Sequence, residues 1–234
     1  RSRGLGDVYK RQDMPNDVEF IINTIKSHGH QAYAVGGCVR DSIMGLTPND
    51  WDITTSALPS DIKEYFNKTI DTGIEHGTVT VMLHNVGYEV TTYRIDGEYK
   101  DGRHPSSVEF SDRLTDDLCR RDFTINAMAY NNITGLVDEY GGIDDINNRI
   151  IKCVGNPIER FTEDALRMMR AIRFSAQLGF TIDEATWNAI KKLSPSISKI
   201  SMERVHVELG KTLMSAHPLS LIHISEPTRP RLIS

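Results

Sequence analysis

The sequence predicts an α/β domain with a mixed or antiparallel sheet, followed by an all-α segment. In the N-terminal half, short helical and extended patterns follow one another without the regular β-α-β repeat of a doubly wound fold. After residues 150–154 the spacing of apolar residues changes, and from Pro157 onward it is almost wholly helical. We therefore place a domain boundary near Gly155, between a first part of residues 14–154 and a second part of residues 155–218.

The elements of the first part are predicted from the spacing of apolar residues. Apolar residues recur at helical intervals from Val18 to Ile25, and Gly29 stops this helix. Tyr33 to Val35 is the end of a short buried strand. In chain order, the remaining predicted elements are a helix over residues 38–44, a strand over 53–55, a helix over 60–66 capped by Ser60 or Ser56, and strands over 69–73, 78–83 and 88–94, the last two joined by a turn at 84–87.

Residues 96–105 interrupt these patterns with a polar stretch that contains two glycines. We interpret it as a mobile loop near the functional site, and a plain hairpin connection is an equal alternative. In the second part, helices are predicted over residues 165–178, 184–193 and 202–214. Because this part is too short for a core of its own, we expect it to pack on the first part and on residues that this sequence lacks.

The two ends of the chain are related at the level of DNA. Residues 2–12 (SRGLGDVYKRQ) are the translation of the reverse complement of one codon choice for residues 219–229 (LSLIHISEPTR). This DNA resembles a transposon adaptor used in sequencing libraries. We therefore interpret residues 1–13 and 219–234 as non-native, adaptor-like tails and exclude them from the fold prediction. The natural protein is then expected to start at Met14 and to continue beyond Pro218 with residues that this sequence lacks.

Composition narrows the class of protein. The formal net charge is −5, and the part between the tails is more acidic still, so any contact with RNA must rest on local basic patches. There is no apolar run of about eighteen residues and no signal sequence after Met14, so we expect no membrane span. Cys38, Cys119 and Cys153 show neither metal spacing nor an even disulfide set, which favours a reducing, cytoplasmic location. The oligomeric state stays open.

Gly36 and Gly37 separate a predicted strand from a predicted helix. A strand, a glycine turn and a helix start bring backbone N–H groups close to an anion. Arg40 adds a fixed cation whose donors fit phosphate oxygens. A tight turn without a ligand is the alternative, but the order and spacing of these residues and the acids that follow favour a phosphate site.

Asp50 and Asp52 follow at a short distance and alternate with Trp51. On an extended segment their carboxylates point to the same side. Two adjacent carboxylates repel each other unless a divalent cation lies between them, and hard oxygen ligands beside a phosphate site indicate Mg²⁺. A solvated turn is the alternative for the acid pair alone.

A second dense stretch, residues 118–127 (LCRRDFTINA), places Arg-Arg-Asp before an apolar segment that is predicted to be a helix. An ordinary helix start with a salt bridge is one interpretation. In the functional interpretation, Arg121 holds triphosphate oxygens with bidentate donors, and Asn126 bonds a ribose hydroxyl. Asp122 either orients an arginine or completes the carboxylate cluster.

The segment of residues 160–173 (RFTEDALRMMRAIR) is predicted to be a helix with Thr162 as its N-cap. Asp164 and Arg167 then lie on one face, which is either a salt-bridged surface or a base-reading site. A carboxylate accepts the amino proton of cytosine or adenine, and a guanidinium donates to the ring nitrogen beside it. Uracil and guanine present the opposite pattern, so one acid and one arginine can select C and A.

Five stretches resemble, in order, the motifs of the class II tRNA nucleotidyltransferases, the family of the CCA-adding enzymes. Bacterial poly(A) polymerases share the first of these motifs. The resemblance extends from about residue 14 to residue 214. The five stretches are residues 36–41 (GGCVRD) with 50–52 (DWD), residues 118–127, residues 135–145 (GLVDEYGGIDD), residues 160–173 and residues 201–204 (SMER).

The resemblance implies an α+β nucleotidyltransferase head with a mixed sheet (residues 14–154), followed by an all-α neck (residues 155–218). It implies template-independent addition of C, C and A to the 3′ end of tRNA from CTP and ATP, with two Mg²⁺ bound by Asp50 and Asp52. The third motif would be a hinge, although a plain loop fits its spacing equally well, and the fifth would brace the template helix. The implied site residues are Asp50, Asp52 and Asp122 as catalytic groups and Gly36, Gly37, Arg40, Arg121, Asn126, Asp164, Arg167, Arg170 and Arg173 as nucleotide-binding groups.

Three alternatives to CCA addition remain open at this stage. A poly(A) polymerase shares the first motifs, but a site that pairs with both C and A favours the tRNA enzyme. Enzymes that add only CC or only A share the same motifs. A nucleotide-binding module without catalysis belongs to another class. The intact acid pair, Asp50 and Asp52, argues against it for the parent gene, whereas the missing C-terminal part leaves it open for this chain.

Overall fold

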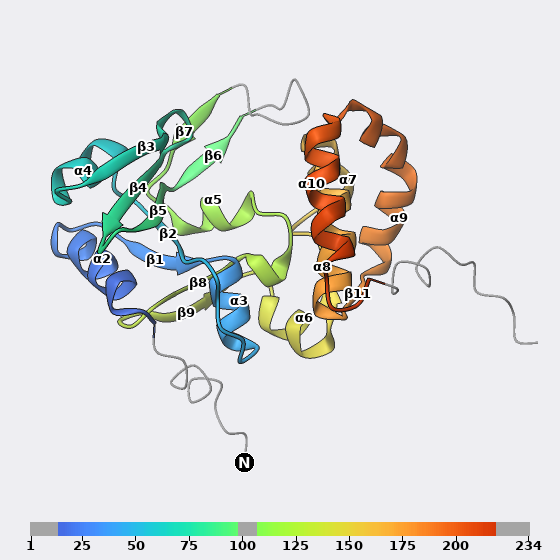
Figure 1. Ribbon diagram of the computed structural model, residues 1–234, viewed down its shortest axis with the longest axis horizontal. Coiled ribbons are helices and arrows are strands. Elements are labelled where there is room, and N and C mark those ends of the chain that lie inside the picture. The colour runs from blue at the N-terminus through green and yellow to red at the C-terminus, as the bar shows by residue number, and fades with distance from the viewer. Residues whose placement is uncertain (1–13, 98–106, 219–234) are drawn as a thin grey trace, which may run out of the picture.

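The computed structural model describes residues 14–97 and 107–218, and Figure 1 shows its two regions, a sheet with short helices and a group of helices beside it. The adaptor-like tails (residues 1–13 and 219–234) and most of the predicted loop at residues 96–105 lie outside the described residues. Within the described part of the chain, no helix is long and apolar enough to cross a membrane.

One mixed sheet of seven strands forms the first region, in the order β3-β4-β5-β2-β1-β8-β9. Only the β2–β5 pair of this sheet is parallel, and the other neighbours are antiparallel. The mixed sheet predicted from the irregular order of elements is therefore confirmed. The strands are β1 (Ala32–Val35), β2 (Asp52–Thr55), β3 (Thr69–Gly73), β4 (Thr78–Leu83), β5 (Val86–Thr92), β8 (Met128–Asn131) and β9 (Gly135–Asp138).

Short helices cover this sheet, and a separate two-stranded hairpin extends from it. Helix α2 (Asn16–Ser27) buries Val18, Ile21, Ile22 and Ile25, the apolar residues that predicted it. The other elements of this region are α3 (Gly37–Ile43), α4 (Pro59–Tyr65), the 3-10 turn η1 (Ile74–His76), the hairpin β6 (Arg94–Asp96) and β7 (Val108–Phe110), α5 (Leu114–Cys119), the 3-10 turn η2 (Thr124–Asn126) and α6 (Gly142–Asn148).

Three local predictions in the first region are wrong. The turn before β5 is formed by His84 and Asn85 alone, both with positive φ, so β5 begins at Val86 rather than at residue 88. The cap of α4 is neither Ser60 nor Ser56, because Leu58 precedes the helix and its N–H donates to the Asp61 carboxylate at 2.9 Å. The segment after Arg121-Asp122 is a single 3-10 turn followed by β8, not a helix.

The second region is helical, as predicted, with one small addition. Helix α8 (Leu166–Leu178) packs along α10 (Met202–Leu213), and a short strand, β11 (Thr181–Ile182), pairs in parallel with β10 (Ile150–Ile151). The remaining elements are α7 (Pro157–Glu163), α9 (Glu184–Leu193) and the 3-10 segment η3 (Ser194–Lys199).

The predicted long helix of residues 160–173 is in fact two helices. It breaks at Asp164, where the backbone is extended (φ −141°, ψ 104°). Thr162 is therefore not an N-cap, since it lies inside α7 and its hydroxyl donates to the Ile158 carbonyl at 2.7 Å. The Asp164 carboxylate instead accepts from the backbone N–H of Leu166 at 3.0 Å and caps the start of α8.

The two regions share one hydrophobic core. Phe123 of the first region meets Phe174 of α8 edge to face, with ring centroids 5.8 Å apart. The segment near the predicted boundary is bonded to both regions, because Val154 donates to the Asp122 carbonyl and Cys153 donates to the Thr186 hydroxyl. Most of the buried apolar residues of both regions belong to one contiguous cluster, and a smaller second cluster that contains Tyr93, Leu114 and Leu118 lies within the first region. The helices are thereby fixed against the sheet domain.

Candidate active site

The predicted carboxylate pair lies where the chain enters the middle of the sheet. Asp52 is the first residue of β2, and Asp50 precedes it; both are exposed, while Trp51 between them is half-buried. Both acids line one cleft of about 450 Å³. The cleft is completed by residues on the N-terminal side of α2, on the loop before β2 and on β5, namely Pro15, Asn49, Trp51, Val86, Gly87, Tyr88 and Glu89.

Glu89 is a third acid in this cleft, and the sequence did not reveal it. Strand β5 runs parallel to β2 with Val90 beside Ile53, so Glu89 comes next to Asp52. Desolvation and then the charges of Asp52 and Asp50 raise the pKa of Glu89. The only local signal was a single acid inside a predicted strand, and the pairing of β5 with β2 could not be read from the sequence.

The pKa of Asp52 is also raised. Although its side chain reaches solvent, desolvation by the walls of the cleft raises this pKa, Arg121 lowers it, and Asp50 raises it again. Negative charge is therefore crowded at this end of β2. An added cation would relieve the repulsion, and carboxylate oxygens are the ligands that Mg²⁺ prefers.

Two acids suffice for such a cation. No group of three or more His, Cys, Asp or Glu side chains in residues 14–97 and 107–218 is arranged to hold a metal ion. Mg²⁺ keeps several of its waters and is commonly held by one or two carboxylates plus substrate phosphates. Asp50 and Asp52 therefore fit a divalent cation that shares its coordination with a phosphate group.

The glycine turn lies against the predicted phosphate arginine of the second motif. Gly36 has φ 83°, a conformation that L side chains rarely adopt, and its N–H donates to the Met128 carbonyl at 3.2 Å. A Cβ at Gly36 would lie 3.1 Å from a terminal nitrogen of Arg121. The charge of Arg121 also lowers the pKa of Asp52, so the arginine beside the turn lies within electrostatic reach of the carboxylate pair.

Arg40, Asn126, Asp122 and Arg170 form a continuous chain of hydrogen bonds. Arg40 donates to Asn126 Oδ1 at 2.7 Å, and Asn126 Nδ2 donates to Asp122 Oδ1 at 3.2 Å. Arg170 Nε donates to Asp122 Oδ2 at 2.7 Å. Arg40 also pairs with the neighbouring Asp41 at 2.7 Å. Residues predicted from three separate motifs are thus brought together.

Asp122 is at the centre of this chain and is buried. Burial alone would raise the pKa of its carboxyl group, but the charge and hydrogen bonds of Arg170, together with Asn126, outweigh burial and lower the pKa. Of the two roles considered for Asp122, its contacts match the orientation of an arginine. The described residues contain no three-acid metal group that it would complete.

Phe174, which was not singled out from the sequence, supports three guanidinium groups. Those of Arg40, Arg170 and Arg173 lie 5.1, 5.4 and 4.2 Å from the centre of its ring. Such contacts are favourable because the ring face is negative. Arg173 is further held by Glu208 of α10, with Nε at 2.6 Å from Oε2. Phe174 is one of several apolar residues of α8, so no sequence signal marked it for this role.

Asp164 and Arg167, the predicted base-reading pair, are bonded to different parts of the protein. Asp164 accepts from Arg204 at 2.9 Å, so the fifth motif does brace this segment. Arg167 donates to Glu163 at 2.5 Å and to the Arg120 carbonyl at 3.2 Å. Because Asp164 precedes α8 rather than lying on it, the two side chains are not on one helical face.

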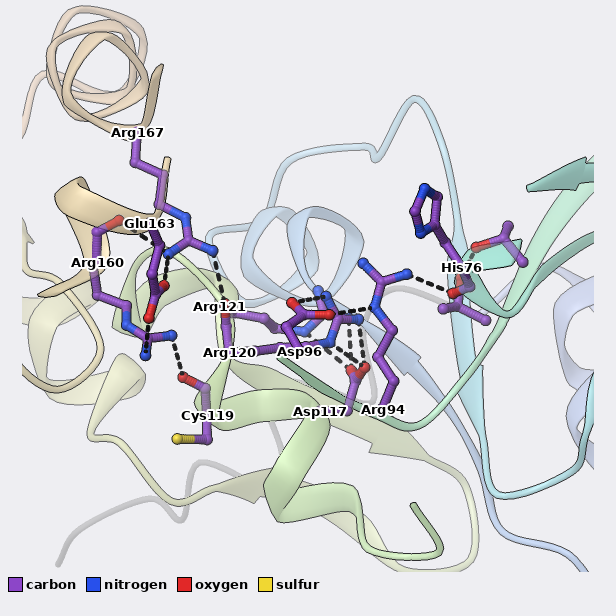
Figure 2. A network of polar contacts seen from close by, with 12 residues as sticks. His76, Arg94, Asp96, Asp117, Cys119, Arg120, Arg121, Arg160, Glu163 and Arg167 are labelled. Carbon is purple, nitrogen blue, oxygen red and sulfur yellow. Dashed lines mark hydrogen bonds and ion pairs between the residues drawn. The ribbon is translucent and has the colours of Figure 1, made fainter. Parts of the chain in front are cut away.

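A network of charges runs past the C-terminal end of α5, as Figure 2 shows. Arg160 donates to the carbonyl of Cys119, the last residue of this helix, and Arg167 donates to the carbonyl of Arg120, which follows it. Asp117 accepts from Arg120 and Arg121. The network continues through Asp96 to Arg94 and on to the His76 carbonyl.

The third motif is ordered and tightly packed. Asp138 at the end of β9 accepts from the N–H groups of Gly142 and Ile143 and so caps α6. A Cβ at Gly142 would lie 2.5 Å from the Thr124 carbonyl, so only glycine fits there. This segment forms part of β9 and of α6 rather than a plain loop, and its Gly142 packs against Thr124 of η2 in the second motif.

Two family profiles match the sequence. A profile described as the poly(A) polymerase head domain matches residues 32–152, about half of the chain. A second profile, described as a probable RNA and SrmB binding site of polymerase A, matches residues 179–223. The first match covers most of the sheet region, and the second covers α9 and α10.

Relatives and solved structures agree with these profiles. The CCA-adding enzyme of Ligilactobacillus salivarius is 52% identical over 198 residues, which are 85% of this chain and 49% of that enzyme. That of Limosilactobacillus reuteri is 50% identical over 200 residues, which are 86% of this chain and 50% of that enzyme. The chain therefore spans about half the length of the curated relatives it matches.

Among solved structures, the Bacillus stearothermophilus CCA-adding enzyme in complex with CTP superposes with a TM-score of 0.83 at 43% identity, covering 91% of this chain and 52% of that one. The Thermotoga maritima CCA-adding enzyme complexed with tRNA superposes with a TM-score of 0.77 at 26% identity, covering 94% of this chain and 53% of that one. The predicted head fold with a helical neck is confirmed.

Proposed function

This chain belongs to the family of the poly(A) polymerase head domain, and from that premise we propose that it is the catalytic and nucleotide-binding part of an enzyme that adds C, C and A to the 3′ end of tRNA from CTP and ATP. The names of its relatives support this choice of activity within the family. Because the chain spans about half of those relatives, the activity is proposed for the whole protein of which it is a part.

One observation carries the proposal. The carboxylates of Asp50 and Asp52 share a cleft, and Arg121, held against the Gly36 turn, is close enough to lower the pKa of Asp52. Acids that attract a divalent cation thus lie beside a cation and a glycine turn that attract phosphate. Nucleotidyl transfer needs both, because a triphosphate reaches the acids only as a metal complex.

Asp50 and Asp52 would hold two Mg²⁺, which would activate the RNA 3′-hydroxyl and neutralise the triphosphate during departure of pyrophosphate. The hydroxyl loses its proton to solvent, and its oxygen forms a bond to the α-phosphorus while the bond from that phosphorus to the oxygen bridging to the β-phosphate breaks and pyrophosphate leaves. We assign the triphosphate and sugar to Gly36, Gly37, Arg40, Arg121, Asn126, Arg170 and Arg173. No covalent intermediate with the protein is involved.

Asp122 is assigned an orienting role within this set. Its carboxylate holds Arg170 and Asn126, and Asn126 in turn holds Arg40. Arginine donors fixed in this way lose less conformational entropy when a phosphate binds. The residue would act through its neighbours rather than through the metal.

Asp164 and Arg167 are assigned to the Watson–Crick edge of the incoming base. A carboxylate has about four acceptor sites, and Asp164 accepts two hydrogen bonds from protein donors, so it can still accept from the amino group of C or A. The bond from Arg204 fixes its orientation. Arg167 must turn from Glu163 toward the base for this assignment to hold.

A poly(A) polymerase is the second candidate, because the matching profile carries that description. Products separate the candidates. Full-length protein should be incubated with tRNA lacking its CCA end and each labelled NTP, and the products resolved at single-nucleotide length. Addition of C, C and A that then stops supports the proposal. A long A tail indicates the polymerase, CC or A alone indicates a partial enzyme, and binding of NTPs without any product indicates a nucleotide-binding module.

A further inference from the structure

Asp117 is a fully buried acid that joins two arginines. Its side chain has no exposure to solvent. One oxygen accepts from Arg120 at 2.6 and 3.1 Å, and the other accepts from Arg121 at 2.9 and 3.3 Å. Both guanidinium groups therefore use their Nε edge on the same carboxylate (Figure 2).

The two arginines also determine the charge of this acid. Burial would raise the pKa of Asp117, but the charges and hydrogen bonds of Arg121 and Arg120 lower it below its ordinary value. Asp117 is thus an anion at neutral pH and holds both guanidinium groups with charge-assisted bonds. Neither arginine can rotate without leaving part of a buried carboxylate unpaired.

Arg121 is consequently fixed from two sides. Asp117 binds its Nε and one terminal nitrogen, and its other terminal nitrogen lies against Gly36, where a Cβ would be only 3.1 Å away. Because Asp117 occupies one edge of the guanidinium group, the edge at the glycine turn is the one that a phosphate would meet. A flexible arginine in this position would lose rotamer entropy on binding.

We propose that Asp117 is a positioning residue that holds Arg121 in the orientation that receives the triphosphate of the incoming nucleotide. The inference rests on the proposed function, because it assigns Arg121 to the triphosphate. The alternative is that Asp117 only ties α5 to the two residues that follow it, as an ordinary i, i+3 and i, i+4 pair would.

The Asp117 carboxylate, which is shared by Arg120 and Arg121, also connects Arg121 to the helical region. Arg120, the second partner of Asp117, receives at its carbonyl the hydrogen bond from Arg167, the proposed base reader. Its guanidinium lies 3.9 Å from Asp96 at the end of β6. Arg121 is thus linked to the helical region through the Arg120 carbonyl, which belongs to the peptide bond between the two arginines, and through the carboxylate that both side chains share.

A double-mutant cycle tests the proposal. The variants are Asp117→Asn, Arg121→Ala and the combination, made in this chain, with CTP and CMP affinities measured by calorimetric titration and folding checked by thermal melting. Asp117→Asn should weaken CTP about tenfold and leave CMP within twofold. In the Arg121→Ala background, Asp117→Asn should cause no further loss of CTP affinity, because the arginine that Asp117 positions has been removed. Asp116→Asn, next in the chain and bonded to Ser111 at 2.6 Å, is the matched control.

The outcomes separate the inference from the proposed function. Wild-type chain that binds CTP no more tightly than CMP contradicts the triphosphate site itself. If wild type prefers CTP, then an unchanged preference in Asp117→Asn, or effects that add in the double variant, overturns the role of Asp117. Should Asp117→Asn not fold, Asp117→Glu keeps the charge and moves the carboxylate by one methylene, and the same loss of CTP but not CMP affinity is expected.

Discussion

Two groups of aspartates in this protein have the same chemistry and opposite surroundings. Asp50 and Asp52 lie in an open cleft with Glu89, acid beside acid, and the pKa of Asp52 is raised. Asp117 and Asp122 are buried under arginines, and the pKa of each is lowered. The first group carries negative charge that its protein neighbours do not fully balance, whereas the second is balanced within the protein.

The difference indicates separate roles for the two groups of aspartates. A buried ion pair holds geometry, because each partner would be costly to leave alone. An open pair of like charges is poorly suited to holding geometry and well suited to attracting a cation from solution. We infer that the chain keeps its arginines in place with one set of acids and exposes the other set to the metal and the nucleotide.

The largest expected effect comes from the open group. Asp52→Ala in the full-length protein should lower nucleotide transfer about 10³-fold or more, equivalent to about 4 kcal/mol, because a metal ligand is lost. Its melting temperature should not fall, since a repulsive charge has been removed. Primer extension and thermal melting measure the two effects, and Asp71→Asn in the exposed pair with Lys63 is the control. Near-normal turnover would contradict the metal assignment.

Substitution in the buried group should instead lower the stability of the fold. Asp122→Ala removes the partner of Arg170 and should cost about 3–5 kcal/mol of unfolding free energy, the usual loss when one member of a buried pair is deleted. Urea denaturation of this chain measures it, with exposed Asp112→Ala as the control. A variant that melts like wild type but loses activity as completely as Asp52→Ala would place Asp122 among the catalytic acids.

A third contrast distinguishes base reading from phosphate holding. Arg121→Ala should weaken CTP, ATP, UTP and GTP alike, because every nucleotide carries the same triphosphate. Asp164→Ala should weaken CTP and ATP by about 1.5–3 kcal/mol, roughly ten- to a hundredfold, and narrow the gap to UTP and GTP. Single-nucleotide incorporation with all four NTPs measures this. An equal loss for all four in Asp164→Ala would make Asp164 a support for α8.

The smallest effect is a pair of opposite pH dependences in stability. The pKa of Asp117 is lowered on folding, so its contribution is present above the unfolded value of about 3.9 and is lost as pH falls through the folded value. The pKa of Asp52 is raised, so its ionisation destabilises the fold as pH rises from about 3.9 through the folded value. Melting temperatures should be measured between pH 3 and pH 7. The melting temperature of Asp117→Asn should lie below that of wild type at pH 7, and the difference should become smaller as the pH falls. The melting temperature of Asp52→Asn should rise relative to that of wild type as the pH increases toward 7. Parallel curves for wild type and both variants would contradict the assigned environments.

The sequence predicted what depends on local pattern. Several elements could be predicted from the spacing of apolar residues and from glycines at their ends, and the structure contains them. They are the helix of residues 18–27, the strands around Gly36 and Asp52, and the helix of residues 184–193. The motifs that carry Asp50, Arg121 and Arg170 were recognised because each is a dense run of unusual residues. These are properties of a few neighbouring positions.

What the sequence missed depends on contacts between distant positions. Glu89 is part of the cleft only because β5 pairs with β2, and Phe174 matters only because three arginines from two regions converge on it. The break at Asp164 was missed because the pattern of residues 160–173 is helical on both sides of it. There a carboxylate that caps α8 and accepts from Arg204 outweighs helix propensity.

The continuous core beneath Gly155 has a consequence for the evolutionary history of the chain. A change of secondary structure near that residue suggests a place where genes could exchange modules. Phe123, Phe161 and Phe174, however, belong to one buried cluster that spans it. A crossover there would join halves whose aromatic side chains had never been selected to fit. Recombinants should therefore survive mainly when both halves come from close relatives, and the sheet and the helices should be inherited together.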